Sequence, residues 1–136
     1  MMALLVSSVL VSSAAALGAA QQASVADGVY TAQQAARGKA AYQSACVACH
    51  QDDLTGDAFA TPLIGETFKQ RWQDSDVGEL FTVVKGTMPQ TKPGELSDEQ
   101  YADIIAYLLL MNSHPAGTHE LGTKPETLSK ITFKSR

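Results

Sequence analysis

"CVACH", residues 46–50, contains both cysteines of the chain and one of its three histidines. A CxxCH pattern is the signature of covalent haem attachment, because its spacing lets two sulfurs reach the two vinyl groups along one edge of the porphyrin. His50 then lies under the iron and supplies an axial nitrogen. We therefore expect one haem c with its iron, bound covalently through Cys46 and Cys49.

Two other uses of a CxxC pair are alternatives. A redox disulfide is expected in a thioredoxin-like βαβ context, and no such strand pattern is visible in the sequence. A zinc site needs a second pair of ligands, for which only histidines are available. His50 directly follows Cys49 and would have to bend back onto the same ion. The haem interpretation is favoured over both.

The N-terminal residues predict export. Residues 1–20 are apolar and rich in small side chains, and the first charged residue is Asp27. This is typical of a signal-peptide hydrophobic region, although no Lys or Arg precedes it. We predict residues 1–26 as the signal peptide, with small-x-small cleavage sites ending at Ala20 or Ala26. An uncleaved anchor is the alternative, because about 20 residues can span a bilayer.

Both alternatives place the remaining domain outside the cytoplasm, and we expect it in the periplasm. In an oxidising compartment, two lone cysteines are normally disulfide-bonded or consumed by a cofactor. Haem attachment satisfies this requirement. The chain has a formal net charge of −4, and its ten cations are scattered without a basic stripe, so a nucleic-acid partner is not indicated.

Residues 27–136 predict a single, mostly helical domain. Thr31 with Gln34, and Ser97 with Gln100, have the spacing of capping boxes at helix starts. Helices are expected over 32–46, over 65–73, between a Ser75 cap and Gly86, and from Ser97 to Asn112. Residues 21–30 are predicted as a linker, 51–64 as a loop and 115–136 as a polar tail. No alternating strand pattern appears, so the predicted fold class is all-α.

Three stretches around CVACH resemble a class I c-type cytochrome. They are Gly38-x-x-x-Tyr42, then KGTMPQ (85–90), then LSDEQYADIIAYL (96–108). The resemblance spans residues 31–112 and implies the cytochrome c fold, with three main helices and short helical turns around one haem. It also implies that the first helix crosses the last at Gly38, with Tyr42 and Tyr107 nearby. Otherwise Gly38 would be a tolerated surface glycine costing its helix about 1 kcal/mol.

The resemblance carries Met88 over as the second axial ligand of the iron, beside His50. The residues agree, because Met88 stands between Gly86 and Pro89 in a stretch that cannot be regular helix. A thioether on such a loop can reach the iron from the side opposite His50. The alternatives are Met88 as core filler and His114 as the sixth ligand.

A carbonyl group is expected to orient His50. The family often shows Gly-Pro-x-Leu-x-Gly after the attachment site, whereas this chain reads ATPLIG (60–65), shifted by one residue. We expect Pro62 or Thr61 to accept the hydrogen bond from the imidazole, which orients the ring and raises its basicity.

Aromatic residues between the two ligands are candidates for the haem pocket. They are Trp72, Phe59 and Phe68, and Trp72 has an indole N–H that can donate to a haem propionate. Packing in the hydrophobic core is an equally good interpretation of these three residues. Arg71 is expected at the surface rather than on a propionate. The acidic residues Asp52, Asp53 and Asp57 favour a solvated face over a calcium site.

Two protein ligands leave the iron no open position, which predicts electron transfer rather than catalysis. The chain is therefore expected to be a periplasmic electron carrier and not an enzyme. Alternatives are a haem c subunit or domain serving an oxidoreductase complex, a haem enzyme with displaceable Met88, and a redox-silent subunit or gas sensor.

The expected partners are redox proteins. A quinoprotein dehydrogenase or a terminal oxidase is considered, since GVYTAQQAARGKAAY (28–42) is similar to cytochromes tied to quinoprotein alcohol dehydrogenases. Membrane contact is expected only if the leader is retained. Lys85, Lys92 and Lys69 are expected near the methionine side, where they would steer an acidic partner.

Overall fold

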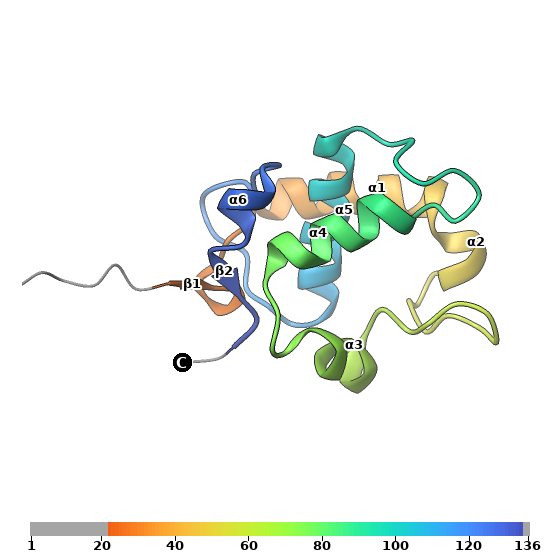
Figure 1. Ribbon diagram of the computed structural model, residues 1–136, viewed down its shortest axis with the longest axis horizontal. Helices are drawn as coiled ribbons and strands as arrows, with labels where there is room; N and C mark the ends of the chain where they lie inside the picture. Colours follow the sequence, from red (N-terminus) through yellow and green to blue (C-terminus); the bar gives the residue numbers. More distant parts are fainter. Residues whose placement is uncertain (1–21, 135–136) are drawn as a thin grey trace, which may run out of the picture.

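Two long helices, α1 (Ala32–Ala45) and α5 (Asp98–Met111), cross at the centre of the fold (Figure 1). The computed structural model describes residues 22–134, so most of the expected leader, residues 1–21, lies outside the described residues. The other elements are β1 (Ala23–Ser24), η1 (Val25–Asp27), α2 (Val47–His50), α3 (Gly65–Trp72), α4 (Val77–Thr87), α6 (Pro125–Leu128) and β2 (Ile131–Thr132). The predicted all-α class is confirmed.

The α1–α5 crossing depends on Gly38. A Cβ atom built at Gly38 would lie 1.8 Å from the carbonyl oxygen of Asp103, so only glycine lets the two backbones approach this closely. The rings of Tyr42 and Tyr107 pack beside the crossing with centroids 5.4 Å apart. Arg37 also joins the helices, because its Nε and Nη2 each donate to one Asp103 carboxylate oxygen at 2.9 Å. The expected close approach is confirmed.

The predicted N-caps of both crossing helices are present. Thr31 Oγ1 accepts from the backbone N–H of Gln34 at 3.1 Å. Ser97 Oγ accepts from the N–H of Gln100 at 3.2 Å, and the Gln100 side chain accepts from the N–H of Ser97 at 3.0 Å. This reciprocal pair satisfies two backbone donors at the start of α5.

The start and end of α4 differ from the prediction. Asp76, not Ser75, is the N-cap, and its carboxylate accepts from the N–H of Glu79 at 2.8 Å. Ser75 lies one position further from the helix, and its hydroxyl donates to the Glu79 side chain. The helix continues through Gly86 to Thr87.

The C-terminal residues, predicted as a polar tail with a short apolar patch at Leu128, Ile131 and Phe133, pack against the rest of the domain. Leu121 and Leu128 are buried, and α6 packs against α4. The buried side chain of Gln34 fixes this segment to α1, because it accepts from the N–H of Leu121 at 2.7 Å and donates to its carbonyl at 2.9 Å. The segment after α5 therefore belongs to the domain.

The two ends of the described chain meet in a small parallel sheet, which the sequence pattern did not predict. Ala23 pairs with Ile131 and Ser24 with Thr132. Ser24 and Val25, which fall inside the expected leader, are 3% and 1% exposed. Residues 22–30 therefore form part of the fold rather than a free linker. Within the described residues, none of the helices combines the length and the apolar character needed to cross a membrane.

Candidate functional site

His50 ends the short helix α2 and is held by hydrogen bonds on both its ring and its backbone. Its Nδ1 lies 3.0 Å from the carbonyl oxygen of Thr61, and its own carbonyl accepts from the N–H of Gly56 at 3.1 Å. The residue is 8% exposed. Because Nδ1 donates to Thr61, Nε2 carries the free lone pair, and a neutral imidazole in this tautomer is a metal ligand.

The loop 51–64 folds back so that Thr61 reaches this position. Leu54 is fully buried and its carbonyl accepts from the N–H of Leu63 at 2.8 Å, which fixes the two sides of the loop in register. The acceptor is therefore Thr61, and the alternative acceptor, Pro62, does not form this bond. Tyr42 supports the same loop, since its hydroxyl donates to the carbonyl of Gln51 at 2.7 Å.

The two cysteines frame α2 and are both free thiols. Cys46 is half-buried, and burial, with a smaller contribution from Cys49, raises the pKa of its thiol to about 11. Cys49 is exposed at the surface. The two cysteines lie three positions apart, about one helical turn, with Cys46 half-buried and Cys49 at the surface.

Met88 is fixed from two elements. Its backbone N–H donates to Val84 at the end of α4 at 2.8 Å, and its carbonyl accepts from the hydroxyl of Tyr101 in α5 at 2.7 Å. Lys85 and Asp98 join the same two helices by an ion pair of 2.6 Å. The sequence pattern placed Tyr101 on the buried face of its helix, but a contact with a backbone 13 residues away has no local sequence signal.

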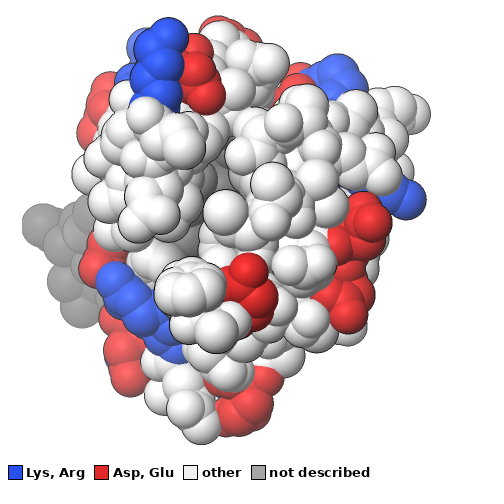
Figure 2. Space-filling view, turned by 90° about the vertical axis from the view of Figure 1, so that its right-hand side faces the viewer, with Lys and Arg blue, Asp and Glu red and all other residues white. Residues whose placement is uncertain are grey.

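One face of the molecule carries α2, the loop 51–64 and the segment 88–97. These lie on the right in Figure 1, and Figure 2 looks directly at that side. Figure 2 shows a hollow near the centre of this face, bordered mostly by uncharged side chains, with Lys, Arg, Asp and Glu mainly toward the periphery. Such a hollow is suited to a large apolar group that leaves one edge at the surface.

These residues fit a haem. Within residues 22–134, no hydrogen bond to His50 Nε2 is found and Nε2 is not among atoms buried without a partner, so it is accessible as an iron ligand. The second ligand candidate, Met88, is half-buried on a separate segment. Two buried apolar side chains adjoin the supporting residues: Leu54 pairs with Leu63 in the loop that carries Thr61, and Phe81 packs on Tyr101, whose hydroxyl binds the Met88 carbonyl.

The remaining aromatic candidates divide into three cases. Trp72 is 7% exposed and packs on Phe68 with ring centroids 6.4 Å apart, while Arg71 stacks over its indole at 4.2 Å. Its indole N–H has no partner among the described residues, so a propionate role for Trp72 stays a prediction. Phe68 is core. Phe59 is 99% exposed, so the expectation that it lines a pocket is wrong.

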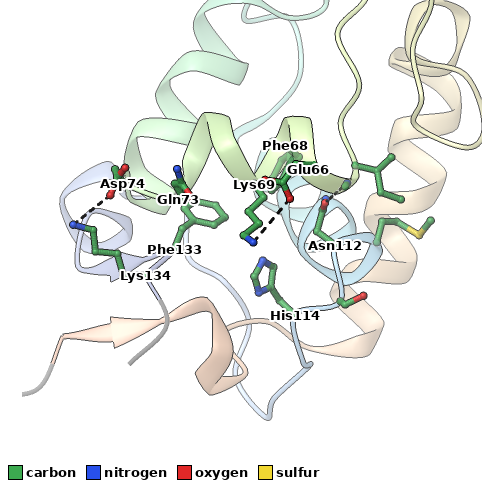
Figure 3. A pocket seen from close by; sticks show the side chains of 13 residues that line it. Glu66, Phe68, Lys69, Gln73, Asp74, Asn112, His114, Phe133 and Lys134 are labelled. Carbon is green, nitrogen blue, oxygen red and sulfur yellow. Dashed lines mark hydrogen bonds and ion pairs between the residues drawn. The ribbon is translucent and has the colours of Figure 1, made fainter.

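A second hollow lies elsewhere, between α3 and the two chain segments 111–114 and 133–134 (Figure 3). It has a volume of about 920 Å³, and neither cysteine, His50 nor Met88 lines it. His114 lies here, with its ring 6.1 Å from that of Phe133, and burial lowers the pKa of its imidazole. The structure thus places His114 beside α3 and Phe133 rather than in the hollow of Figure 2.

The charged residues near the site are arranged differently from the expectation. Lys85, Lys92 and Lys69 each lie within 4 Å of a carboxylate, at 2.6, 3.8 and 3.9 Å. Asp53 and Asp57 accept hydrogen bonds from nearby backbone N–H groups of their own loop. In the part of the chain that the structure describes, no three His, Cys, Asp or Glu side chains are grouped to hold a metal ion.

The family model described as cytochrome C oxidase, cbb3-type, subunit III matches residues 33–108, which is more than half of the chain. The chain belongs to this family of c-type cytochrome domains. No curated protein and no solved structure matches it. The match includes CVACH, Met88 and the α1–α5 crossing, so the expected cytochrome c fold is confirmed. A c-type cytochrome domain carries covalently bound haem c and transfers electrons, and the match supports no link to quinoprotein enzymes.

Proposed function

We propose that this c-type cytochrome is an exported, periplasmic protein that carries single electrons on one haem c. The haem is attached through Cys46 and Cys49, and its iron is held by His50 and Met88. One observation carries the proposal: the imidazole of His50 is fixed at Nδ1 by the carbonyl of Thr61, which leaves Nε2 as a free donor atom.

Hydrogen bonds support both proposed ligand residues. The Thr61 carbonyl orients the His50 ring and increases the basicity of Nε2. Met88 is bonded at its N–H to α4 and at its carbonyl to α5, so its side chain starts from a fixed backbone. Ligands that stay in place when the charge of the site changes need little reorganisation, and low reorganisation suits electron transfer. A methionine ligand also raises the reduction potential relative to a second histidine.

The bound haem would supply the one-electron chemistry, and this chain would supply its anchoring, ligands and dry surroundings. If His50 and Met88 both hold the iron, the protein would leave no ligand position open for substrate. The exposed Cys49 marks where the attached edge reaches the surface. Electrons would therefore enter and leave at the face of Figure 2.

A second candidate function is favoured by the family match, whose name describes a subunit of a cbb3-type oxidase. In that case the domain would pass electrons within or to a terminal oxidase complex. Service to a quinoprotein dehydrogenase rests only on the similarity of residues 28–42.

The burial of Ser24 and Val25 supports cleavage of the leader after Ala20, because cleavage after Ala26 would remove β1 and the cap of η1.

The test is to express the full chain in cells that mature haem c and to record spectra and potentials of the purified protein. Met88→Ala should abolish the sulfur-to-iron absorption band, lower the potential and allow carbon monoxide to bind the reduced protein. Met111→Ala is the matched control, because Met111 lines the hollow beside α3 and should leave all three unchanged. Haem that dissolves into acidified acetone, or a sulfur-to-iron band that persists in Met88→Ala, contradicts the proposal.

A further inference from the structure

The most exposed apolar side chain in the described part of the chain is on a turn that is attached to His50. Phe59 is 99% exposed, and the next large exposed apolar residue, Leu110, is 46% exposed. Single exposed apolar residues are common on protein surfaces and need no function by themselves. The position of Phe59 is what distinguishes it.

The turn that carries Phe59 is closed by several hydrogen bonds. The Asp57 carboxylate accepts from the N–H groups of Phe59 at 2.7 Å and Ala60 at 2.9 Å, and the Asp57 N–H donates to the Ala60 carbonyl at 3.1 Å. Gly56 has φ of +69°, and a Cβ there would lie 2.0 Å from the Ala60 oxygen. These contacts define the backbone path of the turn, and the Phe59 side chain is exposed to solvent on it.

Both ends of this turn are hydrogen-bonded to His50. Gly56, before the turn, donates to the His50 carbonyl, and Thr61, after it, accepts from the His50 ring. The turn thus projects from the residue proposed as iron ligand. The loop 51–64 lies next to α2 on the right of Figure 1, on the face that Figure 2 shows around the hollow.

The charge around Phe59 is negative. Residues 51–64 contain three aspartates and no Lys or Arg. Within residues 22–134, Asp52, Asp53 and Asp57 form no ion pair, whereas Lys85, Lys92 and Lys69 are each paired with a carboxylate. Hydrogen bonds from Thr55 lower the pKa of Asp53, which keeps it ionised. The lysines that were expected to steer an acidic partner lie outside this loop, and the loop itself is negatively charged.

We propose that Phe59 and the aspartates of the loop 51–64 form the docking surface for a redox-partner protein that presents an apolar pocket bordered by Lys or Arg side chains. The proposal rests on the proposed electron-transfer function. Opposite charges increase the rate of encounter, and an aromatic anchor that enters a pocket slows dissociation. A turn closed by hydrogen bonds lowers the cost of ordering that anchor on binding. A partner docked there would lie against the face of the molecule on which Cys49 is exposed.

The experiment measures second-order electron-transfer rates of the full haem-loaded protein by stopped flow. The electron acceptors are a purified basic monohaem cytochrome c and a purified acidic blue-copper protein, each over a series of salt concentrations. The wild-type protein should react faster with the basic acceptor, and added salt should slow that reaction. Phe59→Ala should lower the low-salt rate about fivefold or more, as expected for loss of an anchor residue.

Matched variants separate anchor, charge and general surface effects. Leu110→Ala removes another exposed apolar side chain and should leave the rate unchanged. Asp52→Asn and Glu126→Gln change the net charge equally, but Glu126 is in α6, on the opposite side of Figure 1 from α2. Asp52→Asn should reduce the rate and its salt dependence more than Glu126→Gln does.

The inference is overturned if Phe59→Ala reacts with the basic acceptor at the wild-type rate, or if the acidic acceptor is preferred. Voltammetry of each variant distinguishes this failure from failure of the proposed function. A reversible one-electron couple with unaltered docking kinetics refutes only the docking surface. A protein without a reversible couple refutes electron transfer itself.

Discussion

Replacing Gly38 with alanine tests the central packing of the fold. In a helix that makes no contacts at this position, Gly→Ala is stabilising by about 1 kcal/mol, because alanine has the higher helix propensity. Here the new methyl group would lie 1.8 Å from the Asp103 oxygen, 2.4 Å from the Asp103 carbonyl carbon and 3.0 Å from Tyr107 Cβ. Two of these atoms are backbone, so no side-chain rotation relieves the overlap.

The size of the effect follows from the required movement. To reach an ordinary contact the helices must separate by more than 1 Å, and a gap of that size forfeits about a quarter to a half of the local dispersion energy. Tyr42 and Tyr107, packed at the crossing, are 1% and 5% exposed, and truncating a large buried aromatic costs about 3–5 kcal/mol. If each of the two tyrosine rings loses about a quarter to a half of its packing energy, and about 1 kcal/mol of helix propensity is gained, the net destabilisation is about 2 kcal/mol.

The assay is urea and thermal unfolding of the haem-loaded protein, followed by far-ultraviolet circular dichroism. Gly38→Ala should lower the melting temperature by about 10 °C for a domain of this size. Gly86→Ala is the matched control in α4, because nothing lies within 4 Å of its added methyl, and it should stabilise by about 0.5–1 kcal/mol. Gly78→Ala should destabilise, since its methyl would lie 2.8 Å from the Pro125 oxygen. If Gly38→Ala proves as stable as Gly86→Ala, the close crossing of α1 and α5 is refuted.

Two further predictions concern the C-terminal half. Burial lowers the pKa of His114 below its ordinary value of 6.5. The unfolded chain therefore binds a proton more readily than the folded chain. The free energy of unfolding should fall as the pH drops through 6.5 and level off below the folded-state pKa. In urea titrations at several pH values, His114→Gln should remove this decrease. The control His119→Gln, at an exposed histidine, should retain it. An unchanged pH profile in His114→Gln would contradict the assignment. Leu128→Ala should cost about 2–5 kcal/mol because Leu128 is fully buried in α6, whereas a loss within 0.5 kcal/mol would mean that the C-terminal segment does not pack as described.

The features that the sequence predicted correctly are local. Capping at Thr31 and Ser97 depends on residues three positions apart, and the burial of Leu80 and Phe81 follows from helical periodicity. Local signals of this kind act within one or two helical turns, so one sequence is enough to detect them. The CVACH motif is a local signal of the same kind, since both cysteines and His50 lie within five consecutive residues, and their role in haem attachment stays a prediction.

The features that the sequence missed depend on partners far along the chain. The β1–β2 sheet joins residues 108 positions apart, in strands of only two residues, too short to show alternation. Gln34 is polar and was assigned only to a cap, yet its side chain binds Leu121, 87 residues away. The choice of Thr61 over Pro62 likewise depends on how the loop pairs Leu54 with Leu63. Such contacts are set by tertiary packing, which overrides local preference.

The α1–α5 crossing also links stability to the proposed chemistry. Helix α1 ends at Ala45, directly before Cys46, so its position determines where both thiols and His50 lie. Helix α5 holds the Met88 carbonyl through Tyr101, so its position determines where the second proposed ligand lies. The separation of the two ligand segments therefore depends on how closely these helices approach at Gly38. A methyl group that pushes the helices apart would therefore also shift the Met88 segment relative to α2, and in the proposed haem site that shift would weaken ligation by Met88.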